Sequence, residues 1–127
     1  MTHTAHAQAV KPAVEALDTL DTLRDTYMRH TGADSRPTVR TDMLGGIGLV
    51  ITYASTSTYA LESRASGDGR FMHRVNREWY KSAADIPLTY RKARAIASSV
   101  ESANAIELIA AQRAYETAYS AYRSSGL

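Results

Sequence analysis

The sequence predicts an all-α protein, a bundle of about four helices with a long C-terminal helix. Apolar residues recur at spacings of three and four over 13–27 and again over 71–80, which is the period of a helix that buries one face. Residues 88–123 contain no Gly or Pro and are rich in alanine, the strongest helix former. A chain of 127 residues with a hydrophobic fraction of 44% has the size and composition of one globular domain.

The first predicted helix follows a short tail. Residues 1–10 show no hydrophobic period and are expected to form a flexible N-terminal tail, which leaves 11–127 as a single helical domain. Pro12 occupies a position that is favourable in the first turn of a helix, and one apolar stripe then runs to Tyr27. A glycine and a proline within 32–37 mark the loop that ends this helix.

Residues 43–61 carry no charged side chain and allow three interpretations. A helix would place large apolar residues on one face and small residues on another. Two strands, 47–53 and 58–61, would instead give an α+β fold with a short hairpin in 47–61. The intervening turn, 54–57, lacks Gly, Pro, Asn and Asp, which argues against a tight hairpin and favours the helix. A transmembrane span is the third interpretation, but half of the stretch is Gly, Ser, Thr and Tyr, which disfavours insertion into lipid.

Two further helices are expected in the C-terminal half. Phe71, Val75 and Trp79 are spaced four apart, which predicts a helix over 70–82. After a stop at Asp85-Ile86-Pro87, the last helix is expected to run unbroken over 88–123. At a rise of 1.5 Å per residue it would span more than about 50 Å, which exceeds what a compact domain of this size needs. We therefore expect its C-terminal part to protrude or to pack on a partner chain.

A row of tyrosines on the last predicted helix indicates an interface. Three of them are spaced four and three apart and share a face with one leucine. Tyrosine offers a large contact area with a polar tip, and it is enriched where proteins associate. The predicted partner interface comprises Leu108, Tyr115, Tyr119 and Tyr122. A homo-oligomer or a larger protein assembly is the expected state.

The segment 64–94 is basic, with eight Lys or Arg against three Asp or Glu, whereas the remainder of the chain is net acidic. Phosphate backbones attract such patches because binding releases condensed counterions. The candidate nucleic-acid contacts are Arg70, His73, Arg74, Arg77, Lys81, Arg91, Lys92 and Arg94. An acidic protein partner or a plain solvated helix face fits the same pattern.

Known catalytic patterns are missing from the sequence. The chain has no cysteine, which excludes disulfides, zinc–thiolate sites and thiol nucleophiles. The glycines of 45–48 are not followed by the lysine of a phosphate loop, and no His-x-x-x-His or Gly-x-Ser-x-Gly pattern occurs. We therefore predict no catalytic residue, no cofactor and no metal, and no enzymatic function. The N-terminus has no apolar run of a signal peptide, so a cytoplasmic location is expected, with a virion or another particle left open.

Residues 107–116, Glu-Leu-Ile-Ala-Ala-Gln-Arg-Ala-Tyr-Glu, resemble the C-terminal helix of flagellar rod and hook proteins. Those axial proteins pair an N-terminal with a C-terminal helix and polymerise through them. The resemblance covers ten residues, and the Asn- and Pro-Gly-bearing motif of that family is absent, so no function is carried across. The residues themselves predict a helical assembly or adaptor protein that self-associates, such as a component of a larger particle. The alternatives are nucleic-acid binding through 64–94 and membrane association through 43–61.

Overall fold

The fold is α+β rather than all-α. A computed structural model describes residues 2–126, which form three helices and a five-stranded antiparallel sheet. The elements in chain order are α1 (Thr2–Thr31), β1 (Thr38–Arg40), β2 (Leu49–Ser55), β3 (Ala60–Ser66), β4 (Phe71–Val75), β5 (Glu78–Tyr80), α2 (Arg91–Ser102) and α3 (Ala105–Ser125), with the 3-10 turns η1 (Leu44–Gly46), η2 (Ala83–Asp85) and η3 (Leu88–Tyr90) between them. The predicted four-helix bundle is therefore wrong. The α+β alternative, with a hairpin in 47–61, is closer to the structure.

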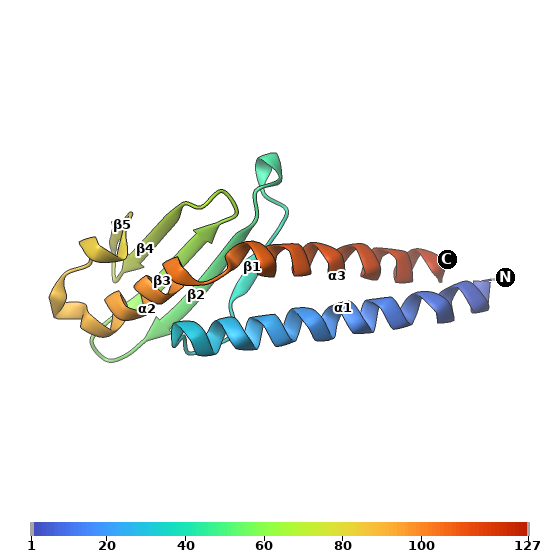
Figure 1. Cartoon of the computed structure of the whole chain (residues 1–127), viewed down its shortest axis with the longest axis horizontal. Helices are drawn as coiled ribbons and strands as arrows, with labels where there is room; N and C mark the ends of the chain where they lie inside the picture. Colours follow the sequence, from blue (N-terminus) through green and yellow to red (C-terminus); the bar gives the residue numbers. More distant parts are fainter. Residues whose placement is uncertain (1, 127) are drawn as a thin grey trace.

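The sheet is a meander in sequence order, and its two faces differ (Figure 1). One face carries buried residues, such as Val50 opposite Ala65, and packs against α1, α2 and α3. Because side chains alternate along a strand, the intervening residues lie on the opposite face, which we call the outer sheet face. Register places on the outer sheet face Arg40, Ile51, Tyr53, Glu62, Arg64, Met72, Arg74 and Trp79.

The β2–β3 hairpin shows why the helical interpretation of 43–61 is wrong. The last strand pair is Ser55 opposite Ala60, so the turn begins two residues later than the sequence suggested. Thr56 closes it: its amide donates to the Tyr59 carbonyl at 2.8 Å, and its hydroxyl accepts from the Thr58 amide at 3.1 Å. The Thr56 side chain therefore stabilises this turn, which needs neither the Gly nor the Asn of tighter turns.

The predicted helix over 70–82 is also wrong, because this segment forms the β4–β5 hairpin. A spacing of four residues fits a strand as well as a helix, since residues two and four apart share one face of a strand. Phe71 and Val75 indeed share the helix-covered face of the sheet, whereas Trp79 follows a two-residue turn and lies on the outer sheet face. Asn76 occupies the left-handed region at φ 57°, which asparagine tolerates better than most residues.

The long C-terminal helix is broken at residues 103–104, so the unbroken helix predicted over 88–123 is wrong. Ala103 is extended, with φ −81° and ψ 157°, and Asn104 caps the next helix by accepting from the Glu107 amide at 3.0 Å. The side-chain Nδ2 of Asn104 in turn donates to the Glu107 carboxylate at 3.4 Å. The break directs α2 across β3 and β4 and lets α3 follow α1.

The helices α1 and α3 pair along their length and extend together beyond the sheet, with both chain ends at the far tip (Figure 1). We call this pair the helical hairpin. A helix over the apolar stripe that ends at Tyr27 and a loop at 32–37 were predicted correctly, but α1 begins at Thr2, so Pro12 lies inside the helix and not in its first turn. Residues 2–10, expected as a tail, form the first turns of α1, and Met1 lies outside the described residues. Their flexibility stays a prediction.

No helix in the described part of the chain is both long enough and apolar enough to cross a membrane. The uncharged stretch 43–61 contains η1, β2 and the turn into β3 instead. The membrane-spanning interpretation of this stretch therefore has no helix to support it.

Candidate functional site

Small side chains line much of the seam between the two helices of the helical hairpin. On α1, Ala13 is buried while Ala9 and Ala16 are half-buried, and on α3 the half-buried Ala111 and Ala118 recur with the same heptad-like spacing. At the tip the His6 and Tyr122 rings lie 4.4 Å apart, centroid to centroid. Beyond the sheet, each helix therefore has one neighbour only and buries a narrow stripe.

The structure separates the four predicted interface residues. Leu108 is buried in the core against the sheet, so it is not available to a partner. Tyr115 and Tyr122 are half-buried and pack within the helical hairpin. Tyr119 is the exposed member at 42%, and its ring stacks 5.8 Å from that of Tyr115. Of the predicted set, Tyr119 is the most exposed side chain.

An apolar stripe on the outside of α1 was not predicted as an interface. Val10, Val14 and Leu17 are spaced four and three apart and are exposed at 38%, 52% and 37%. We call these three residues the α1 stripe. From the sequence, the apolar residues of this helix were expected on a single buried face. In the sequence, the α1 stripe is signalled by valines that lie between the residues of the buried stripe.

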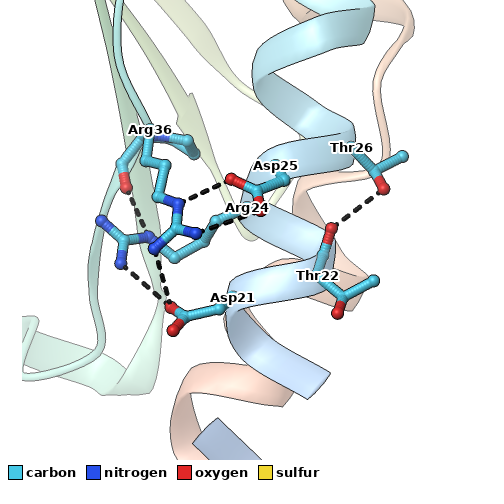
Figure 2. A network of polar contacts seen from close by, with 7 residues as sticks. Asp21, Thr22, Arg24, Asp25, Thr26 and Arg36 are labelled. Atoms are coloured by element: carbon cyan, nitrogen blue, oxygen red, sulfur yellow. Dashed lines mark hydrogen bonds and ion pairs between the residues drawn. The ribbon is translucent and has the colours of Figure 1, made fainter. Parts of the chain in front are cut away.

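Near the base of the helical hairpin, charged side chains fasten α1 to the loop that precedes β1 (Figure 2). Arg36 binds the Asp25 carboxylate with two nitrogens, at 2.6 and 3.0 Å, and lies 3.5 Å from Asp21. The Nε of Arg24 donates to the Pro37 carbonyl at 3.0 Å. The hydrogen bond from Arg36 lowers the pKa of Asp25 below its usual 3.8. These contacts fix the loop that leads from α1 into β1.

The basic residues predicted to contact nucleic acid come from several separate segments of the chain. Arg70 pairs with Asp68 in the β3–β4 turn, and Arg77 lies in the β4–β5 turn. Lys81 follows β5, while Arg91, Lys92 and Arg94 lie at the start of α2. His73 is 0% exposed and faces the helices. Only Arg74 of the predicted set lies on the outer sheet face.

The outer sheet face collects aromatic and arginine side chains from four strands. Tyr53, Glu62, Arg74 and Trp79 form one row of directly opposed residues across β2 to β5. Tyr53 and Trp79 are 44% and 40% exposed. The guanidinium carbons of Arg64 and Arg74 lie 4.9 and 5.7 Å from the centroid of the Trp79 ring. Sequence reasoning missed this cluster because it appears only once the strands and their register are known.

A serine, a histidine and a glutamate are linked in the interior. His73 Nδ1 lies 2.9 Å from the Ser63 hydroxyl, and its Nε2 lies 2.6 Å from a Glu101 carboxylate oxygen. The same oxygen accepts from the Ala83 amide at 2.7 Å. The sequence of contacts from serine through histidine to carboxylate resembles a proton relay. Ser63 and His73 are fully buried, however, so a substrate has no access to them. The network joins β3, β4, η2 and α2.

Comparison with protein-family models, with curated proteins and with solved structures finds no match for this chain. Among the residues that the structure describes, no group of three or more His, Asp or Glu side chains is arranged to hold a metal ion. Two exposed surfaces with distinct compositions are the apolar α1 stripe and the outer sheet face, which carries aromatic and arginine side chains.

Proposed function

We propose that this protein is an assembly module that self-associates by packing the α1 stripe of one copy against the α1 stripe of a second copy. The observation that carries the proposal is the exposure of three branched aliphatic side chains, Val10, Val14 and Leu17, on one line of a helix. This line lies on the part of α1 that extends beyond the sheet (Figure 1). Apolar stripes at helical spacing bury themselves against other helices when a partner is present.

The thin seam of the helical hairpin favours such a partner. Alanine contacts bury little apolar area, and a helix pair gains stability mainly from the apolar area it removes from water. A second helical hairpin laid along the first would produce a four-helix arrangement beyond the sheet. Its new core would contain the α1 stripe of both copies.

The pattern of residues along α1 favours a second copy in antiparallel orientation. The α1 stripe is close to symmetric about Val14, so a two-fold axis there would set apolar side chains against apolar side chains. Lys11 lies on the N-terminal side of this centre, whereas Glu15 and Asp18 lie on the C-terminal side. Antiparallel packing would bring each cationic end beside an acidic end, which opposite charges stabilise.

The test is the solution mass of the full chain, measured by size-exclusion chromatography with light scattering. We expect the wild type to have a mass of at least twice the 13.9 kDa of one chain. Val14→Glu should shift the mass to the monomer, because it places a charge at the centre of the interface. Leu88→Glu is the matched control, since Leu88 is 64% exposed but lies in η3, away from the helical hairpin. It should leave the mass unchanged.

A monomeric wild type, or equal loss of association in both variants, would contradict the proposal. Circular dichroism of Val14→Glu should show the helix content of the wild type, because the substituted side chain is exposed. The chain has no cysteine, which fits a reducing compartment, and we propose that assembly takes place in the cytoplasm.

A further inference from the structure

The outer sheet face is a second surface with a composition of its own. The helices α1, α2 and α3 pack on the opposite face of the sheet, where Val50, Leu61 and Val75 are buried. On the outer sheet face, Tyr53 and Trp79 present aromatic rings at the two ends of a four-residue row. With neighbouring strands about 4.8 Å apart, the two residues are separated by roughly 14 Å across the sheet.

The charges on this face are mostly positive and only partly neutralised. Three arginines, Arg40, Arg64 and Arg74, stand against Glu62. Arg64 binds Glu62 at 2.6 Å. Among the described residues, Arg40 and Arg74 have no carboxylate within 4.0 Å, so both guanidinium groups are free to bind an anion.

We infer that the outer sheet face binds single-stranded nucleic acid. Unpaired bases stack on the rings of Trp79 and Tyr53, and the arginines hold the phosphate backbone. Aromatic side chains on an uncovered sheet accept bases of any sequence, because every base has a π-face. The Arg64 guanidinium above Trp79 belongs to the same stack, since planar guanidinium groups also stack on bases.

Two other ligands fit the surface less well. A double helix keeps its bases paired and stacked inside, so the rings of Tyr53 and Trp79 would contact only its backbone. An acidic polypeptide would satisfy the arginines but has no flat ring to place on the exposed aromatic side chains. Both ligands therefore serve as comparison probes in the experiment.

The single tryptophan of the chain makes the test direct, because the only indole emission comes from Trp79. We expect an oligothymidylate to quench this emission, and a polyglutamate of equal charge to bind more weakly without quenching. A duplex of the same length should also bind more weakly than the single strand. Equal affinity for polyglutamate or for the duplex, or no binding of the single strand, would overturn the inference.

Substitutions locate the binding site independently of the emission. Anisotropy of a labelled oligothymidylate should show roughly tenfold or greater loss of affinity for Trp79→Ala and a smaller loss for Trp79→Phe, which keeps a ring. Arg74→Ala should weaken binding and reduce the slope of log affinity against log salt by about 0.7. Arg91→Ala, an exposed arginine at the start of α2, is the control. A larger loss for Arg91→Ala than for Arg74→Ala would overturn the inference.

This inference is independent of self-association. Val14→Glu, which should abolish the assembly, leaves every residue of the outer sheet face in place. Trp79→Ala should likewise leave the solution mass unchanged. The two sets of variants therefore separate failure of one proposal from failure of the other.

Discussion

The Nε2 atom of His73 lies 2.6 Å from the carboxylate of Glu101, and both ring nitrogens of His73 have partners in a fully buried position. Because an ionised carboxylate only accepts hydrogen bonds, Nε2 carries the hydrogen in this pair. Glu101 belongs to α2, whereas His73 belongs to β4. The contact therefore fastens α2 to the sheet through a fully buried imidazole and a carboxylate that keeps 27% of its surface exposed.

Loss of this carboxylate should destabilise the protein strongly. Glu101→Ala removes the acceptor of both the His73 ring and the Ala83 amide, and it leaves buried donors without partners. We expect a loss of about 2–4 kcal/mol in the free energy of unfolding, measured by urea denaturation. Glu107→Ala, which removes an exposed carboxylate from α3, should cost less. Equal losses in the two variants would show that the hydrogen bonds of Glu101 contribute no more to stability than the exposed carboxylate of Glu107 does.

Gly48 sets how closely α3 approaches the sheet. A Cβ at this position would overlap the side chain of Ile109, one of the buried residues of the main core. Gly48→Ala should therefore destabilise the protein by about 1–3 kcal/mol through overpacking. In the background of Ile109→Ala, the same substitution should cost little, because the space is then open. A double-mutant cycle on thermal or urea unfolding measures this coupling, and strict additivity of the two changes would contradict the contact.

The pair Asp25–Arg36 makes stability depend on pH in the acid range. The hydrogen bond from Arg36 lowers the pKa of Asp25 below 3.8, so the unfolded state binds protons more readily than the folded state. The stability from this pair is therefore present above about pH 4 and is lost as the pH falls through the lowered pKa of Asp25. Arg36→Gln should lower the melting temperature at neutral pH and approach the wild type near pH 2.

Arg77→Gln is the control for this measurement, because Arg77 is exposed in the β4–β5 turn and makes no ion pair within 4.0 Å among the described residues. Its melting temperature should follow that of the wild type at every pH. A difference between Arg36→Gln and the wild type that persists undiminished at low pH would rule out the Asp25 carboxylate as the cause.

Exchange of charges along α1 should alter self-association in a predictable way. In the antiparallel arrangement, Lys11 of one copy lies near Asp18 of the other, so Lys11→Glu should weaken association through like-charge repulsion. The double variant with Lys11→Glu and Asp18→Lys should recover part of the loss, because the opposite charges face each other again. Sedimentation equilibrium at low salt gives the dissociation constants. Failure of the second change to restore any affinity would contradict the antiparallel orientation.

The first helix could be predicted from sequence because its signals are local. Pro12 and the apolar stripe to Tyr27 indicate a helix, and the glycine and proline of 32–37 indicate its end. The break before α3 was missed, although the sequence contains a signal for it. Asn104 and Glu107 are spaced as in a capping box, so a helix start is encoded inside the alanine-rich stretch.

Other features depend on contacts that a single sequence does not display. A spacing of four at Phe71 and Val75 fits both a helix and a strand, so periodicity alone could not separate them. The link from Ser63 through His73 to Glu101 joins residues far apart in the chain. The place of Trp79 beside Arg64 follows from the register of three strands. Each of these features is decided by tertiary packing.

The most direct test of the proposed assembly uses the absence of cysteine from the chain. A two-fold axis at Val14 brings the two copies of this residue face to face, within the Cα separation of about 4.4–6.8 Å that a disulfide requires. Val14→Cys should form a covalent dimer under mild oxidation, seen on a non-reducing gel, while Leu88→Cys, which is more exposed, should remain mostly monomeric. Equal cross-linking of the two variants, or none in Val14→Cys, would contradict self-association centred on α1.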